Sequence, residues 1–149
     1  MKHIVETVEQ LYNTNEPTGE MIIDEVVDAV RKTQTQNASD IALLLDVDRR
    51  DLSIAFKLLT GIPLNQMVLE WRMLQARDLL DDKSLSVLEV AHRCGFKQQK
   101  NLILAFRRHW GTTPFAYRTG KLIRNSNYVV NKDSRSRKKA LSIRDYKGL

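Results

Sequence analysis

Four neighbouring polar side chains, Gln98, Gln99, Lys100 and Asn101, offer amide and ammonium groups within one short stretch. Groups of these types form hydrogen bonds with the edges of bases or bind phosphate oxygens. A hydrated surface explains the same stretch without any ligand. The choice between the two interpretations depends on the elements that hold these side chains.

The residue types that most often carry catalysis are scattered. His92 and Cys94 lie two residues apart, which places them on different faces of a helix. His3 and His109 have no cysteine or carboxylate at the spacing of metal ligands. The sequence contains no HExxH, GxGxxG, P-loop or paired-cysteine motif. It therefore predicts no catalytic residue, no metal site and no cofactor.

Two stretches of the chain share one pattern. The first part repeats at an offset of 49, as Asn37, Asp40, Ile41 and Ala42 in one copy and Ser86, Glu89, Val90 and Ala91 in the other. The second part repeats at an offset of 50, as Leu52, Phe56 and Gly61 and then Leu102, Phe106 and Gly111. A single residue inserted in the second turn accounts for the difference. Each copy is typical of a helix-turn-helix.

Local signals agree with this pattern. Ser86 and Glu89 form a capping box, in which two side chains satisfy free N–H groups at a helix start, and Asn37 offers a weaker cap. Gly95 and Asp46 occupy the turns, where a positive φ favours residues of these types. The glycine that closes each copy is predicted to end its second helix.

The predicted fold class is all-α, because no convincing strand pattern occurs. We expect helices at residues 4–12, 21–32, 37–45, 48–59, 63–80, 86–94, 97–109 and 114–118. The long helix at 63–80 would join the two helix-turn-helix subdomains. The chain would divide into an N-terminal helical extension (1–36), a double helix-turn-helix domain (37–118) and a basic, mobile tail (119–149).

The net charge of +6 is unevenly distributed. Residues 1–36 and 37–92 carry −4 and −3, whereas residues 93–117 and 118–149 carry +5 and +8. A polyanion would therefore dock on the second half first. No apolar run approaches the ~20 residues of a membrane span, and the N-terminus lacks a signal-peptide pattern. With a single cysteine as well, the sequence predicts a cytoplasmic protein.

Four spaced motifs occur between residues 37 and 118. They are Leu52-x-x-x-Phe56-Lys57-x-x-Thr60-Gly61, Trp71-Arg72-Met73-x-x-Ala76-x-x-Leu79-Leu80, Val90-Ala91-x-x-x-Gly95-Phe96-x-x-Gln99 and Phe106-Arg107-Arg108-x-Trp110-Gly111-x-Thr113-Pro114-x-x-Tyr117-Arg118. In these motifs the chain resembles the C-terminal DNA-binding domain of the AraC/XylS family of bacterial transcription regulators. The resemblance implies a sequence-specific DNA-binding regulator whose two recognition helices enter successive segments of the major groove.

The resemblance places candidate DNA-binding residues on both recognition helices. On the first they are Arg49, Arg50, Ser53, Ile54 and Lys57, and on the second Lys97, Gln98, Gln99, Lys100, Asn101, Ile103, Leu104, Arg107 and Arg108. The family commonly has arginine where this chain has Ile54 and Leu104, which would contact thymine methyl groups instead. Asp48 and Asp51 would repel phosphates near the first helix. Arg72 is expected to form structural hydrogen bonds, and Trp71 and Trp110 to lie in the core.

The expected partner is double-stranded DNA, and RNA polymerase or another regulator is a candidate for the acidic N-terminal helices. We expect no membrane and no small-molecule effector domain, as in the short, sensor-less members of the family. Two alternatives remain open. One is a protein-interaction module on a degenerate helix-turn-helix, with an exposed apolar patch of Ile54, Ile103 and Leu104. The other is an architectural or recombination accessory protein that binds DNA with low specificity through the basic second half.

Overall fold

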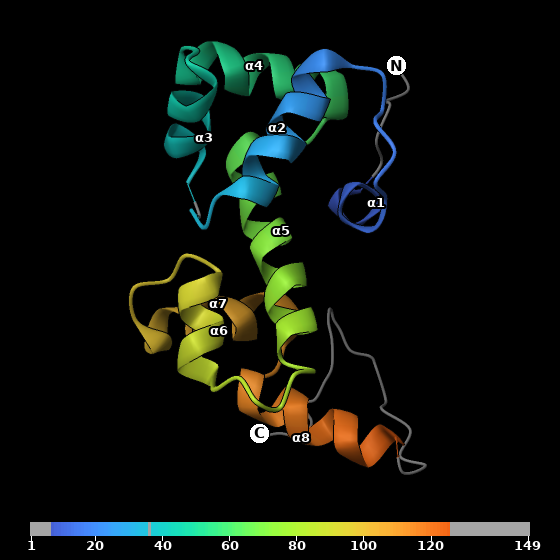
Figure 1. The fold of residues 1–149 in the computed structure, drawn as a ribbon, viewed down its shortest axis with the longest axis vertical. Coiled ribbons are helices and arrows are strands. Elements are labelled where there is room, and N and C mark those ends of the chain that lie inside the picture. The colour runs from blue at the N-terminus through green and yellow to red at the C-terminus, as the bar shows by residue number, and fades with distance from the viewer. Residues whose placement is uncertain (1–6, 36, 126–149) are drawn as a thin grey trace. The chain divides into compact units, whose positions relative to one another are not determined.

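The computed structural model describes residues 7–35 and 37–125, with side chains up to residue 120, and these ranges contain helices and no strands (Figure 1). This confirms the predicted all-α class. The helices are α1 (Val8–Asn13), α2 (Met21–Lys32), α3 (Ala38–Leu45), α4 (Arg49–Thr60), α5 (Leu64–Leu79), α6 (Val87–Arg93), α7 (Gln99–Trp110) and α8 (Pro114–Asn125). The chain forms two compact units, Met1–Gln75 and Ala76–Leu149, and the division falls within α5.

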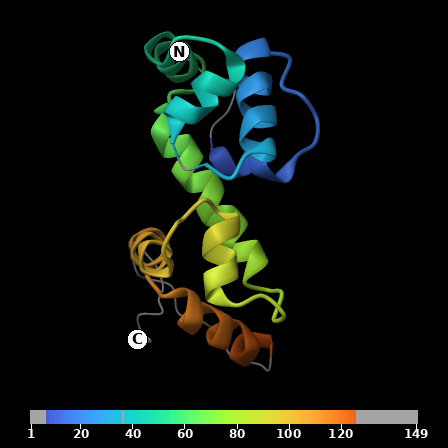
Figure 2. The ribbon, with the colours of Figure 1, turned by 60° about the vertical axis from the view of Figure 1, so that its left-hand side comes forward.

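The first unit is built on α2, which contacts both α3 and α4. Figure 2 shows α2 beside α3. The apolar residues of α2 recur at helical spacing, so that Ile23, Val26 and Val30 form one fully buried face. Ile41 of α3 and Phe56 of α4 are buried with them. The first helix-turn-helix therefore shares its core with the helix that precedes it.

Helix α1 packs on this unit through aromatic and cationic side chains. It spans Val8–Asn13 and starts after a capping box of Thr7 and Gln10, and the predicted helical residues 4–6 lie outside the described residues. Tyr12 meets Trp71 edge to face at 5.0 Å between ring centroids. The guanidinium of Arg31 lies 4.9 Å from the Trp71 ring centroid, and its Nη2 donates to the Thr14 carbonyl at 2.8 Å. The end of α1 is thereby held to α2 and α5.

The loop between α1 and α2 is anchored by one carboxylate. Asp24 accepts hydrogen bonds from the backbone N–H and hydroxyl of Thr18, both at 2.8 Å, and from the Gly19 N–H at 3.2 Å. Burial opposes ionisation, but the Thr18 and Gly19 hydrogen bonds outweigh it and hold the pKa of Asp24 below its usual value. The charged carboxylate thus fixes the approach of the chain to α2.

The second unit contains α6, α7 and α8. Its core includes Val90 of α6 and Leu102 and Phe106 of α7, all fully buried. The Phe106 ring meets that of Tyr117 of α8 at 5.8 Å. Arg118 donates from Nε to the Leu80 carbonyl at 2.9 Å, which joins α8 to the end of α5.

Helix α8 corrects one predicted boundary. It begins at Pro114 as predicted, but it continues to Asn125 instead of ending at Arg118. Residues 119–125 therefore belong to a helix, and not to the tail in which we expected them. The predicted mobility of the rest of the tail concerns residues 126–149, which lie outside the described residues.

Candidate nucleic-acid interface

The two helix-turn-helix copies turn in the same way. Asp46 and Gly95 both adopt positive φ, of 58° and 88°. The residue that follows each donates its backbone N–H to the alanine of the preceding helix, Val47 to Ala42 at 3.0 Å and Phe96 to Ala91 at 2.9 Å. Beyond this point the second copy has one residue more, because α4 starts at Arg49 and α7 at Gln99. The repeat and its single insertion are confirmed.

Helix α4 exposes most of its predicted DNA-binding residues. Asp48 caps the helix by accepting from the Asp51 N–H at 3.0 Å. Leu52 and Phe56 are buried on one face. The remaining face presents Arg49, Arg50, Ile54 and Lys57 to solvent, while Ser53 is half-buried. The structure thus brings four of the five predicted residues onto the surface of one helix.

Helix α7 repeats this arrangement but starts later than predicted. It begins at Gln99, so that Lys97 and Gln98 precede the helix and do not belong to it. Gln98 has extended backbone and makes no side-chain cap. Burial of Leu102 and Phe106 turns most of the predicted residues outward. Those exposed in or just before the helix are Lys97, Gln98, Gln99, Lys100, Asn101, Leu104, Arg107 and Arg108.

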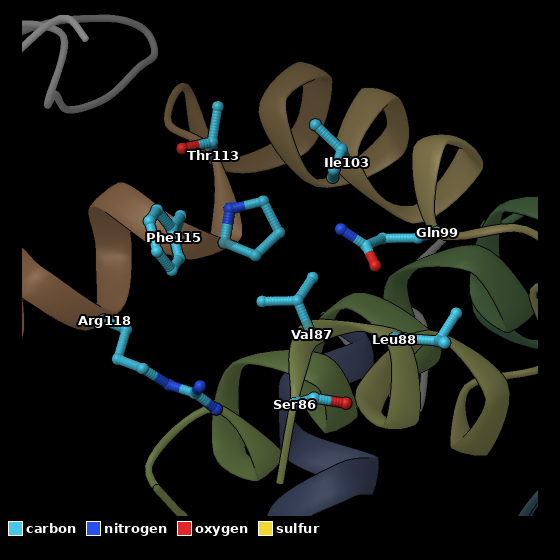
Figure 3. A pocket seen from close by; sticks show the side chains of 9 residues that line it. Ser86, Val87, Leu88, Gln99, Ile103, Thr113, Phe115 and Arg118 are labelled. Atoms are coloured by element: carbon cyan, nitrogen blue, oxygen red, sulfur yellow. The ribbon is translucent and has the colours of Figure 1, made fainter.

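Ile103 departs from the expected exposed apolar patch. It is half-buried and lines a cavity of about 590 Å³ together with Val87, Leu88 and Phe115 (Figure 3). Figure 3 shows Gln99 at the same cavity, on the α7 side. Ile103 therefore packs toward α6 and α8, whereas its neighbour Leu104 is 57% exposed. The expected patch of Ile54, Ile103 and Leu104 is reduced to two exposed residues on separate units.

Phe115 has a position for which the sequence interpretation assigned no role. Its side chain is 73% exposed at the start of α8, beside the cavity that Gln99 also lines. The sequence contains one signal for an exposed role of Phe115, namely an aromatic residue at an unspecified position of the Pro114-x-x-Tyr117 motif.

The structural roles predicted beside the recognition helices are confirmed for two residues. Arg72 is 1% exposed and hydrogen-bonded to carbonyl groups, and Trp71 is 2% exposed. Trp110 is only half-buried, and its ring meets that of Phe106 at 6.3 Å and the Arg77 guanidinium at 5.3 Å. Trp110 therefore lies at the edge of the core of the second unit.

Charge distinguishes the two units. Residues 1–75 contain seven Lys and Arg against twelve Asp and Glu, a net charge of −5. Residues 76–149 contain seventeen against six, a net charge of +11. The exposed face of α4 has Asp48 and Asp51 at its start, whereas the residues described as α7 include no acid. The second unit therefore carries the charge that attracts a polyanion.

Within the described ranges no three His, Cys, Asp or Glu side chains gather in a way that would hold a metal ion. No single helix there is long and apolar enough to cross a membrane, and only α4 and α5 counted together, as a bent pair, reach that length and composition.

Known proteins resemble this chain over the region that contains its two helix-turn-helix copies. A family model described as a helix-turn-helix domain matches residues 41–120. The transcriptional activator RhaR of Cronobacter sakazakii is 35% identical over 72 residues, which are 48% of this chain and 25% of RhaR. This chain therefore spans a quarter of the length of that relative.

Solved structures agree with this match. The DNA-binding domain of the global transcriptional factor AdpA, solved in complex with a target DNA, is 32% identical, with a TM-score of 0.64. That match covers 74% of this chain and 100% of the AdpA domain. A transcriptional regulator of Chromobacterium violaceum with an AraC-type DNA-binding domain is 29% identical over 64% of this chain and 89% of its own, with a TM-score of 0.52.

Proposed function

The chain belongs to the helix-turn-helix family of AraC-type DNA-binding domains, and from this premise we propose that it is a sequence-specific DNA-binding transcription regulator. The observation that carries the proposal is that α4 and α7 share one arrangement of buried and exposed residues. Each helix buries a leucine and a phenylalanine and exposes cationic side chains on the opposite face. Such a helix fits the major groove, with its first turns against the base edges. The two helices then read two segments of the groove.

The units contribute unequally to binding on this proposal. Lys100, Arg107 and Arg108 of α7 contact phosphates, and the net charge of +11 on residues 76–149 strengthens the attraction. Asp48 and Asp51 weaken the same contacts at the start of α4. The second unit therefore anchors the protein on DNA, and the first adds sequence discrimination at a neighbouring segment.

We place the action of the protein on chromosomal DNA in the cytoplasm, with RNA polymerase or a second regulator as its protein partner. Glu25 and Asp28 on the exposed side of α2 provide an acidic surface for that contact. The DNA-binding domain begins near residue 37 on this proposal, and α8 extends it to Asn125. The family is one of DNA-binding regulators and not of enzymes, and we assign the chain no catalytic step.

The test is fluorescence anisotropy of the whole chain on a random duplex and on a duplex selected from a random pool, each titrated with salt. We expect the chain to bind the selected duplex with an affinity at least about 10³-fold higher than its affinity for random DNA. Lys100→Ala should weaken binding and lower the slope of log affinity against log salt by about one. Lys83→Ala, an exposed lysine outside the helices, is the matched control and should change neither.

Two results would contradict the proposal. A steep salt dependence without any sequence preference would favour the low-specificity architectural protein. Absence of binding to either duplex at ~50 mM salt, where backbone contacts are strongest, would favour the protein-interaction module.

A further inference from the structure

The exposed faces of α4 and α7 share a second pattern beyond their core residues. A cation, an aliphatic residue and a cation follow one another as Arg50, Ile54 and Lys57 in α4 and as Lys100, Leu104 and Arg107 in α7, at a constant offset of 50. All six side chains are exposed. We call each set a reading stripe. In both helices the stripe begins at the second residue, so the two stripes occupy equivalent positions.

Helical geometry places each stripe opposite the core. Residues at i, i+4 and i+7 share one face, and Leu52 with Phe56, or Leu102 with Phe106, occupies the other. The outer two residues are about 10 Å apart along the axis, and the major groove is about 12 Å wide. With the stripe toward DNA, the long cationic side chains reach phosphates on the two walls of the groove. The central aliphatic residue then faces its floor.

The central positions are apolar and solvent-exposed in the free protein. Ile54 is 53% exposed and Leu104 57% exposed. Neither side chain can donate or accept a hydrogen bond, so packing it against a polar base edge would leave that edge desolvated and unpaired. The C5 methyl group of thymine is the apolar group that bases present in the major groove. A thymine is therefore the base that each central residue accommodates at least cost.

We propose that Ile54 and Leu104 are specificity-determining residues, each of which recognises one thymine of the target DNA through its methyl group. The inference rests on the proposed function, because it names the chemistry by which the two recognition helices discriminate. The target then contains one required thymine in each of two segments. Arg50, Lys57, Lys100 and Arg107 position the stripes on the phosphates and carry no preference of their own.

Other exposed aliphatic residues lack this setting. Leu43 is 79% exposed on α3, the first helix of its helix-turn-helix, and no cations lie at i−4 and i+3 around it. The docking geometry of a helix-turn-helix places the second helix in the groove. Leu43 therefore serves as a matched control of equal chemistry outside a reading stripe.

The experiment replaces single thymines of the selected duplex with deoxyuridine, which removes only the methyl group. Affinity of the whole chain for each duplex is measured by anisotropy at fixed salt. We expect a loss of about fourfold at one thymine in each segment, the size expected for one buried methyl group. With Ile54→Ala the loss should disappear at one of these thymines, and with Leu104→Ala at the other. Leu43→Ala should retain both losses.

Each other outcome has a defined meaning. If the wild-type chain binds every deoxyuridine duplex as tightly as the parent, while still preferring the selected site to random DNA, the inference is wrong and the proposed function stands. If methyl sensitivity persists in both Ile54→Ala and Leu104→Ala, other residues read the thymines and the inference is again wrong. If no duplex is preferred to random DNA, the proposed function and the inference both fail.

Discussion

At the residue scale, Arg72 joins three segments of the first unit through hydrogen bonds from its guanidinium. Its Nε donates to the Thr35 carbonyl at 2.7 Å and its Nη1 to the Gln75 side chain at 2.8 Å. Its Nη2 donates to the carbonyls of Val30 at 3.0 Å and Thr33 at 2.7 Å. The last carbonyls of a helix have no partner within it. One guanidinium from α5 thus satisfies the end of α2 and the connector to α3.

Replacing this guanidinium tests its structural role. Arg72→Lys keeps the charge but places all donors on one nitrogen, which cannot reach acceptors spread over a planar fork. One buried and two part-buried carbonyls would lose their partner, so we expect the free energy of unfolding of the first unit to fall by about 2–4 kcal/mol. Urea unfolding followed by Trp71 fluorescence, in a Trp110→Phe background, measures this unit because the chain has two tryptophans.

The matched control is the exposed Arg50→Lys, for which a change within about 0.5 kcal/mol is expected. A similarly small change for Arg72→Lys would show that water replaces the guanidinium without loss, and the structural role would have to be abandoned.

At the scale of elements, the two turns place different residue types in the same left-handed backbone conformation. An L-residue in the left-handed region costs about 1–2 kcal/mol, and glycine avoids that cost. The first turn holds Asp46 at a φ of 58°, and the second holds Gly95 at 88°. The hydrogen bonds around them match, from Asp46 N–H to Leu43 and from Gly95 N–H to His92, both at 3.1 Å. The strain is therefore carried by the first turn alone.

Replacing Asp46 with glycine and Gly95 with alanine should change the free energy of unfolding in opposite directions. Asp46→Gly relieves the strain, but glycine also has more conformational freedom in the unfolded chain, which offsets part of the gain. We expect the free energy of unfolding of the first unit to rise by about 0.5–1 kcal/mol. Gly95→Ala should lower the stability of the second unit by about 1 kcal/mol. Urea unfolding is followed by tryptophan fluorescence in two backgrounds. A chain that keeps only Trp71 reports on the first unit, and a chain that keeps only Trp110 reports on the second. Changes of the same sign in both variants would contradict the explanation.

Two helix boundaries were predictable for different reasons. Ser86 forms the predicted capping box with Glu89 at the start of α6. Helix α2 spans the predicted residues 21–32 without a side-chain cap, because its apolar residues recur at helical spacing. Helix α7 was placed two residues early because Lys97 and Gln98 include no strong N-cap residue. Helix α8 outlasts the motif that ends at Arg118, because no proline follows Pro114 and Gly120 is buried within it. The end of α8 was therefore not predictable from the motif that ends at Arg118.

The candidate site also contains features that were predictable from the sequence and features that were not. Burial of Leu52 and Phe56, and of Leu102 and Phe106, follows from their i, i+4 spacing, so the exposure of Arg50 or Lys100 was predictable. The half-burial of Ile103 was not predictable from this spacing. It depends on Val87 and Phe115, which lie on other helices and form the cavity only in the folded unit.

At the scale of the whole molecule, the reading stripes are alike but their surroundings are not. Each stripe has two cations, yet one belongs to a unit of charge −5 and the other to a unit of charge +11. Charges within about 10 Å act on each other at ~0.1 M salt. Asp48 is the N-cap of α4 and Asp51 lies in its first turn, both close to Arg50 in sequence, whereas α7 has no acid in its first turn. Equal pairs of cations should therefore contribute unequally to DNA binding.

The comparison of two double variants measures this inequality. Arg50→Ala with Lys57→Ala removes the cations of one stripe, and Lys100→Ala with Arg107→Ala removes those of the other. Both variants should lower the slope of log affinity against log salt. The first should lower it by about two, because it loses two phosphate contacts, and the second by more, because its cations act together with the positive charge around them. The second should lose about tenfold more affinity for the selected duplex at ~50 mM salt, since its cations act within a positive field. Raising the salt should narrow that difference, because screening removes the contribution of the surrounding charges. Equal losses at both salt concentrations would mean that each stripe binds DNA independently of the charge of its unit, and the second unit would then not be the anchor.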